Sequence, residues 1–260
     1  MHDLAAIPST IGGITQDLET IDSILNEGNI SELQACLEQL ECRCHLNPKN
    51  PHYFWRLGKA CSRLFVKTHD KAYVIKGIEA CEAALKMKPD LANVHKWYAI
   101  LVGERSQFQS TKKKIADGYL FKEHLDLASD LNPADPTLHF LKGRFAYDVS
   151  ELKWYERKMA SALFATLPTA TVEEALEHFM EAQRLSSVEW KMNMLYIAKC
   201  KLKMGHKDEA MAIVARAQRL PSVSDADTEA DLELNTLRRK SKMSITSFRS
   251  RTRSKFGDLF

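Results

Sequence analysis

One stretch, Met194 to Ser222, constrains the fold more than any other part of the chain. Two segments with small and apolar residues at helical spacing flank Gly205, and Pro221 follows the second of them. Alanines let two helices approach closely, glycine reverses the chain at little steric cost, and proline cannot continue a helix. The stretch therefore predicts an antiparallel helical hairpin. Its packing stripes are Met194, Ile197, Ala198 and Lys201 on the first helix and Ala210, Val214 and Ala217 on the second.

A lone hairpin of this kind leaves an apolar face uncovered, so it predicts further hairpins beside it. The order of its residues follows the tetratricopeptide pattern, and similar segments recur in the chain at irregular periods. The predicted fold is all-α, a tetratricopeptide-like array of antiparallel helix pairs (an α-α superhelix) with irregular inserts. We place repeats near residues 51–89, 93–133, 136–187 and 191–222, within a helical repeat domain of residues 13–237.

The segments outside these repeats have distinct compositions. Residues 1–12 predict a flexible leader, and residues 225–237 predict a closing helix. Residues 238–260 are rich in Ser, Arg and Lys with little to bury, so we expect a disordered basic tail. The apolar and aromatic insert within residues 147–170 predicts a helix of its own, with no role that its residues define. No stretch reaches the roughly 20 apolar residues of a membrane span, and the N-terminus lacks the basic flank of a signal peptide, so we expect neither.

The composition is that of a soluble globular protein, with 45% hydrophobic and 27% charged residues. Six cysteines at irregular spacing favour reduced, mostly buried thiols. Cys42, Cys44 and His45 resemble half of a metal site, but no second pair of ligands completes it. The chain also lacks a Gly-rich phosphate loop, a GxSxG motif and an HExxH motif. We therefore expect no enzymatic activity, no cofactor and no bound metal.

The inner face of such an array comes from the first helix of each hairpin. Counting outward from the packing stripes places Lys59, Arg144 and Lys199 at matching positions among aromatic and apolar neighbours. Cations above an apolar floor suit an acidic peptide or an anionic lipid. The alternative is that these charges only solvate exposed helix faces. The candidate groove residues are Lys59, Arg63, His95, Tyr98, Arg105, Phe140, Arg144, Tyr147, Lys199 and Lys203.

The net charge of +3 hides an asymmetry. Residues 238–260 hold eight basic residues and one acid (+7), which leaves 29 basic and 33 acidic residues (−4) before them. Such a tail is attracted to polyanions, whether acidic protein tails, membranes or nucleic acid, although it could also bind nothing in particular. Ser241 and Ser254 follow basic residues and are candidates for basophilic kinases, and each phosphate would remove roughly two positive charges. The candidate polyanion-binding residues are Arg238, Arg239, Lys240, Lys242, Arg249, Arg251, Arg253 and Lys255.

Five segments carry a further signal: HKWYA from His95, FKEH from Phe121, LHFLKGR from Leu138, Trp154 and ATVEEAL from Ala170. Taken together, they resemble the regulator of microtubule dynamics protein family over about residues 50–237. The likeness includes the irregular inserts that ordinary tetratricopeptide repeats lack. It implies a helical-repeat protein that associates with microtubules and acts at the spindle, with no catalytic motif. Some similar proteins are anchored to mitochondria and linked to lipid binding.

Three functional hypotheses follow. The first is a cytoplasmic protein of spindle microtubules and spindle poles that binds acidic tubulin tails by electrostatics and recruits an unidentified protein or peptide in its groove, acting in chromosome segregation. The second is a phospholipid-binding or lipid-transfer module at membrane contacts. The third is a chaperone adaptor that clamps an acidic C-terminal peptide. Nucleic acid is not an expected partner under any of them.

Overall fold

The computed structural model describes the backbone of residues 11–153, 157–158, 161–162 and 169–256, and side chains within residues 17–240 of those ranges. Every element in these ranges is a helix, as the all-α prediction requires. The chain divides into two compact units, Met1–Pro133 and Ala134–Phe260. Each unit is considered by itself.

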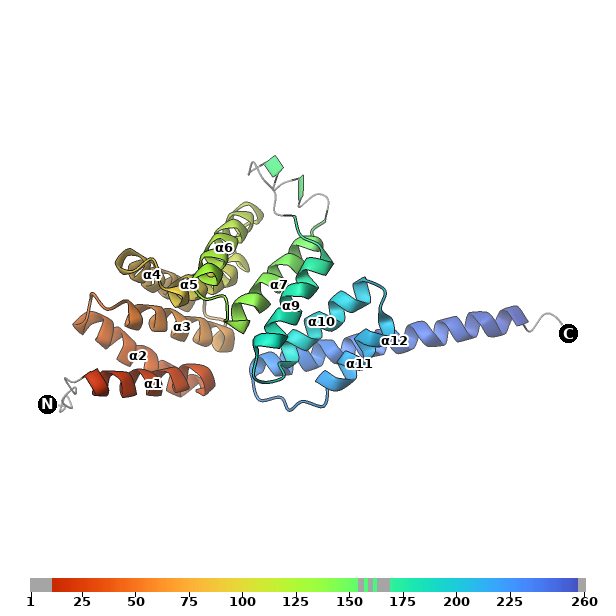
Figure 1. Ribbon diagram of the computed structural model, residues 1–260, viewed down its shortest axis with the longest axis horizontal. Coiled ribbons are helices and arrows are strands. Elements are labelled where there is room, and N and C mark those ends of the chain that lie inside the picture. Colours follow the sequence, from red (N-terminus) through yellow and green to blue (C-terminus); the bar gives the residue numbers. More distant parts are fainter. Residues whose placement is uncertain (1–10, 154–156, 159–160, 163–168, 257–260) are drawn as a thin grey trace. The chain divides into compact units, whose positions relative to one another are not determined.

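The first unit consists of helices joined by short turns (Figure 1). Antiparallel pairs form from α3 with α4 and from α5 with α6, while α1 and α2 pack against α3. Apolar side chains from α1, α2 and α3 form one core cluster, and those of α3, α4 and α5 form another. The helices are α1 (Ile11–Glu27), α2 (Ile30–Leu46), α3 (Pro51–Thr68), α4 (Lys71–Met87), α5 (Ala92–Ser106) and α6 (Thr111–Leu131).

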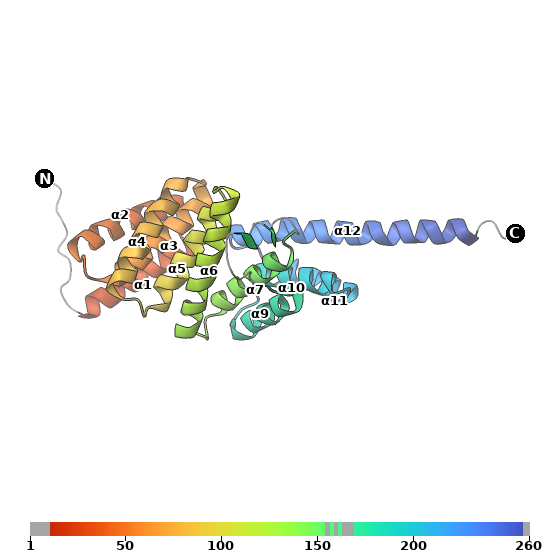
Figure 2. The same ribbon diagram turned by 90° about the horizontal axis from the view of Figure 1, so that it is seen from above.

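The second unit pairs α7 with α9 and α10 with α11, and α12 packs along α10 and α11. Both ribbon views show α12 as one long helix that extends well past the ends of α10 and α11 (Figures 1 and 2). One core cluster joins α7, α9, α10, α11 and the first part of α12. The helices are α7 (Pro136–Ser150), α9 (Val172–Leu185), α10 (Lys191–Lys203), α11 (Lys207–Ala217) and α12 (Asp225–Phe256).

Local sequence explains where most of these helices begin and end. Thr171 and Glu174 form the reciprocal capping box that the sequence predicts at the start of α9. A second capping box is made by Asn29 and Glu32, and α2 starts at Ile30. Gly205 has φ +85°, a conformation that glycine adopts without strain, and this reverses the chain between α10 and α11.

Close packing within the helix pairs depends on glycines, which have no side chain. A Cβ added at Gly143 of α7 would lie 2.7 Å from the ring of Phe179, which is fully buried on α9. Real Cβ atoms do not approach so closely, so a side chain at Gly143 would push the two helices apart. The same reasoning applies in the first unit to Gly58, whose added Cβ would lie 2.5 Å from the Cys81 sulfur.

The ends of the chain differ from expectation. The closing helix expected over residues 225–237 continues as α12 to Phe256, through the segment expected to be disordered. At the other end α1 begins at Ile11, inside the expected leader, and residues 1–10 lie outside the described ranges. Much of the 147–170 insert, with Trp154, also lies outside them, so its expected helix stays a prediction. Within the closing helix Leu234 is fully buried, whereas Leu232, expected to cover the last repeat, is 68% exposed.

Candidate binding surfaces

The candidate cations of α3 lie beneath α1. Lys59 Nζ donates a hydrogen bond of 2.6 Å to the Asn26 side-chain oxygen, and Arg63 Nη2 donates one of 3.0 Å to the Asn26 carbonyl. Beside them Arg56 holds both carboxylate oxygens of Asp22, at 2.9 and 2.6 Å. The inner face of α3 is therefore engaged by polar groups of α1.

Lys59 has an unusual electrostatic environment. Its ammonium lies 5.5 Å from the centre of the Trp97 ring. The pKa of Lys59 is lowered to about 8, mainly by burial; Asp22 opposes the shift, and nearby cations including Lys96 add to it. A lysine with this pKa loses part of its charge under mildly alkaline conditions, and an anion bound beside it would restore the charge.

His95 and Tyr98 of α5 form a polar cluster in the same unit. His95 is only 4% exposed, and its Nε2 lies 2.7 Å from the Pro89 carbonyl, so that nitrogen carries a proton. Its Nδ1 lies 2.9 Å from His124 Nδ1, which donates to it when both rings are neutral. Burial lowers the pKa of His124, and His95 contributes to the shift. The Tyr98 hydroxyl donates to Glu82 at 3.3 Å.

Arg105 is paired with an acid, whereas its neighbour Glu104 is buried beside a serine. Arg105 makes a bidentate ion pair with Asp117 of α6, at 3.2 and 2.7 Å. Glu104 is buried and accepts a 2.7 Å hydrogen bond from Ser62, while its second carboxylate oxygen has no hydrogen-bond partner among the described residues. Burial raises the pKa of Glu104 to about 8, so its neutral form dominates at pH 7. Sequence reasoning missed Glu104. The available signal was an acid among apolar helix positions, three residues after Leu101.

In the second unit the structure brings Arg144 and Lys199 together over one aromatic ring. The Arg144 guanidinium lies 4.6 Å and the Lys199 ammonium 4.4 Å from the centre of the Tyr196 ring. Lys199 also makes an ion pair with Glu233 of α12. We call Arg144, Tyr196, Lys199 and Glu233 the α10–α12 cluster. Its two cations and its aromatic ring suit an acidic group, and Glu233 already supplies one to Lys199.

The remaining candidates of this unit divide between core and surface. Phe140 is 7% exposed, and its ring packs 4.3 Å from Trp190 and 5.8 Å from Phe179, so it belongs to the core. Tyr147 packs edge-on against Tyr196 at 5.7 Å, and burial raises its pKa far above the ordinary value. Lys203 forms an ion pair of 2.6 Å with Glu151 and is exposed.

A second lysine of α10, which sequence reasoning did not single out, is almost completely buried. Lys191 has a side chain that is 2% exposed, and its Nζ lies 2.9 Å from Asp231 of α12. Glu233, the partner of Lys199, follows one half-turn later. The acidic start of α12 thus lies on the cations of α10. The run of acids from Asp225 to Glu233 was the sequence signal for this contact.

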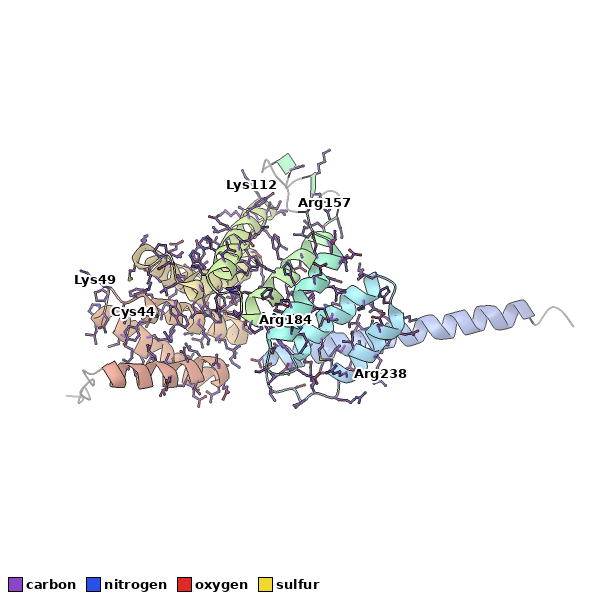
Figure 3. All side chains as sticks on the ribbon, in the orientation of Figure 1. Cys44, Lys49, Lys112, Arg157, Arg184 and Arg238 are labelled. Carbon is purple, nitrogen blue, oxygen red and sulfur yellow. The ribbon has the colours of Figure 1, made fainter. Side chains whose placement is uncertain are left out.

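The first three basic residues that follow on α12 are on the surface. Arg238, labelled in Figure 3, donates a 3.3 Å hydrogen bond to Gln218, and Arg239 bonds to Thr236 of its own helix. Both side chains and that of Lys240 are exposed. The side chains of the other candidates lie outside the described residues: Lys242, Arg249, Arg251, Arg253, Lys255 and the two phosphorylation candidates, Ser241 and Ser254.

The cysteines do not form a reactive group. Five of the six are buried and Cys42 is exposed. Burial raises the pKa of Cys36 to about 11 and those of Cys44, Cys61 and Cys200 to about 12, which disfavours the nucleophilic thiolate. Across the residues that the structure describes, no group of three or more His, Cys, Asp and Glu side chains is placed to hold a metal. The helices in those ranges include none with the length and apolar character of a membrane span.

Comparison with known proteins identifies the family. The sequence profile of the family described as regulator of microtubule dynamics protein 1-3 matches residues 17–243. The chain belongs to this family. Regulator of microtubule dynamics protein 3 of Mus musculus is 40% identical over 189 residues, which is 71% of this chain and 40% of that protein. Regulator of microtubule dynamics protein 2 of Rattus norvegicus is 34% identical over 240 residues, covering 89% of this chain and 58% of that protein.

Two further comparisons limit what can be inferred from membership in this family. The human regulator of microtubule dynamics protein 2 is 38% identical, and the match covers 46% of its length, so the chain spans about half of the curated relatives it matches. Among solved structures, a tetratricopeptide repeat protein of Thermus thermophilus superposes with a TM-score of 0.59 at 16% identity, covering 86% of this chain and 97% of that one. At this identity the similarity concerns the fold alone, and it confirms the tetratricopeptide-like class.

Proposed function

We propose that this chain is a microtubule-associated, non-enzymatic interaction protein of the cytoplasm that acts at spindle microtubules and spindle poles in chromosome segregation. It binds microtubules by electrostatics and recruits a further protein or peptide. The name shared by its relatives motivates the microtubule assignment. The observation that carries the mode of binding is the division of charge along α12.

The two parts of α12 carry opposite charge. Five acids lie between Asp225 and Glu233, and two of them, Asp231 and Glu233, form ion pairs with lysines of α10. All eight basic residues from Arg238 onward follow this docked part. The acids stabilise the packing of the helix, and the bases that are described are exposed. A concentration of like charge attracts a polyanion, such as the acidic tails of tubulin.

Cosedimentation with microtubules tests this mode of binding. Affinity should fall as salt rises, since exposed charges are screened within about 8 Å at physiological ionic strength. A chain truncated after Leu237 should bind at least about tenfold more weakly than the full chain. Neutralising Arg238, Arg239 and Lys240 to Gln should reproduce part of that loss.

A matched control removes the same number of charges elsewhere. Lys112, Lys113 and Lys114 are exposed in the first turn of α6, and Figure 3 labels Lys112 at that end of the helix. Their triple change to Gln should leave most of the binding intact. If the two triple variants lose affinity equally, net charge rather than α12 drives the association. Equal binding by the truncated chain would reject the role of the basic segment.

Recruitment of a partner is assigned to the α10–α12 cluster. An acidic peptide, such as the C-terminal segment that a clamp-type chaperone adaptor would hold, has the charge to replace Glu233 on Lys199. Fluorescence anisotropy of a labelled Asp- and Glu-rich peptide should show weaker binding by Lys199→Gln and by Arg144→Ala. Lys203→Gln, which removes an exposed cation of the same helix, serves as the control. Equal affinities for all three variants and the unmodified chain would remove this assignment.

A phospholipid-binding or lipid-transfer role is the second candidate. Lys59 favours it, because a partly buried amine with a lowered pKa beside Trp97 gains its full charge when an anionic head group binds. Native mass spectrometry of the purified chain separates the candidates. A copurifying phospholipid that is lost in Lys59→Met supports the lipid role, and a lipid-free chain that binds microtubules excludes it.

A further inference from the structure

The loop between α11 and α12 contains a serine that bridges the two charges holding α12 in place. Lys191 Nζ donates hydrogen bonds to Ser222 Oγ at 2.7 Å and to Asp231 Oδ2 at 2.9 Å. The Ser222 hydroxyl donates to the same carboxylate oxygen of Asp231. Lys191 is buried, whereas Ser222 is exposed, so the bridge can be reached from solvent through the serine.

This bridge lies where α12 joins the rest of the unit. Ala230 and Leu234, which lie one turn apart on α12, are fully buried in the core cluster shared with α10. Asp231 stands between them in sequence, and its pKa is lowered, first by the Ser222 hydroxyl and then by Lys191. The serine therefore stabilises the charged carboxylate that pairs with the buried lysine. A change at Ser222 acts directly on the docking of α12.

The sequence around Ser222 has the charge pattern of a kinase substrate. From Ser222 to Asp231 there are four acids, namely Asp225, Asp227, Glu229 and Asp231, and no basic residue. Kinases select substrates partly by charge complementarity, so this segment suits a serine kinase with a basic substrate groove. It contrasts with Ser241 and Ser254, which follow basic residues and suit a kinase of the opposite preference.

Ser224 shares this surrounding but has a different structural place. Its hydroxyl donates to Asp227 at 2.8 Å, and its oxygen accepts from the Asp227 amide at 3.1 Å, which caps the start of α12. A phosphate there would sit at the positive end of the helix, away from the lysine bridge. The two serines therefore make a matched pair that differs in contact with Lys191.

We propose that Ser222 is a phosphorylation site for an acidophilic serine kinase and that its phosphorylation releases the acidic part of α12 from α10. The kinase transfers the γ-phosphoryl group of ATP, so that a bond forms between Ser222 Oγ and phosphorus while the bond from phosphorus to the β-phosphate oxygen breaks. ADP leaves, and the hydroxyl proton passes to the catalytic base of the kinase. This inference does not depend on microtubule binding.

Charge explains the release. Before modification, one lysine and one carboxylate form a neutral pair, and the serine supplies a donor to the carboxylate. The phosphate brings roughly two negative charges and removes that donor. Lys191 cannot neutralise both Asp231 and the phosphate, so the two anions repel each other at the docking site. Separation of α12 would then break the ion pair between Glu233 and Lys199, whose ammonium lies over the Tyr196 ring.

The test combines phosphorylation with hydrogen exchange on the full chain. The chain is treated with a recombinant acidophilic serine kinase and ATP, and mass spectrometry locates the phosphate. We expect modification of Ser222 and amide exchange in residues 191–203 and 225–237 that is roughly ten- to a hundredfold faster, the loss expected for one charge-assisted hydrogen bond. Ser222→Glu should show the same direction of change. Circular dichroism confirms that each variant remains helical.

Two control variants keep the outcome decisive. In Asp231→Asn the like-charge repulsion is absent, so phosphorylation of Ser222 should accelerate exchange much less. In Ser224→Ala the response to Ser222 phosphorylation should persist. The proposal is overturned if the kinase leaves Ser222 unmodified, or if full modification leaves exchange in α10 and α12 unchanged or slower. The latter result would mean that the phosphate strengthens the contact with Lys191.

Discussion

Lys59 and Lys191 occupy comparable places, each on the first helix of a hairpin beneath a terminal helix, but their partners differ. Lys59 of α3 bonds to the neutral amide of Asn26 on α1. Lys191 of α10 bonds to the carboxylate of Asp231 on α12. The comparison teaches that one kind of contact, a covered lysine, can be satisfied by a dipole or by an opposite charge. The two choices give different responses to mutation.

The apolar contacts made by α1 and by α12 also differ. α1 buries Ile21 and Leu25 almost completely, and Leu18 and Ile24 pack against the same cluster. α12 buries the much smaller Ala230 together with Leu234, and Leu232 is exposed. We infer that α1 is held mainly by apolar burial, whereas ion pairs carry a larger share of the docking of α12.

The largest expected effect concerns the apolar cover. Leu25→Ala should destabilise the first unit by about 3 kcal/mol, because a fully buried leucine leaves a cavity when it is truncated. Urea denaturation measures the free energy, and hydrogen exchange in α1 and α3 assigns the loss to this unit. Leu232→Ala, on the exposed side of α12, should change stability by less than about 0.5 kcal/mol. A loss below about 1 kcal/mol for Leu25→Ala would show that polar contacts hold α1.

The next effect concerns the charged cover. Lys191→Met should cost about 2 kcal/mol, because Asp231 loses a charged hydrogen bond while the methionine retains much of the buried volume. Exchange in residues 225–237 should increase, and exchange in the first unit should not. Lys199→Gln removes a more exposed pair and should cost less than about 1 kcal/mol. Should Lys191→Met be as stable as the unmodified chain, ion pairs would not distinguish the docking of α12 from that of α1.

How much of this could be predicted from the sequence depends on the range of the interaction. Helix pairing and the capping box of Thr171 and Glu174 follow from residues close together in the chain, and both are confirmed. At the start of α2 the sequence offers two overlapping signals, because Asn29 with Glu32 and Ser31 with Gln34 both fit the capping pattern, and the structure uses the first. Only the packing of the helix decides between two such overlapping signals.

The surfaces were harder to predict because they depend on contacts between distant segments. Counting from a packing stripe placed Phe140 on an open inner face, whereas the structure packs it against Trp190 and Phe179. The same counting does not reveal that α1 and α12 lie on the lysine-bearing helices. The expectation of disorder after residue 237 considered burial only. It omitted the helix propensity of Arg and Lys and the alignment of acids at the start and bases at the end of α12 with its dipole.

The smallest effect is a dependence of stability on pH that Lys59 causes. The pKa of Lys59 is lowered to about 8, so between pH 8 and 10.5 the unfolded chain binds more protons at this side chain than the folded one does. The stability contributed by this group therefore rises with pH through that window. Lys59→Met loses the hydrogen bond to Asn26 at every pH but also loses this dependence. The difference in melting temperature, variant minus unmodified chain, should become more negative from pH 7 to pH 10.

Lys112→Met is the control for this measurement, because its side chain is exposed in the first turn of α6 and its difference should stay constant with pH. Other groups that titrate in the same window, including tyrosines and cysteines, are common to all three chains and cancel in the differences. A pH-independent difference for Lys59→Met would mean that Lys59 is as well satisfied as a charge-paired lysine. In that case Asn26 and the nearby Asp22 would together do for α1 what Asp231 does for α12.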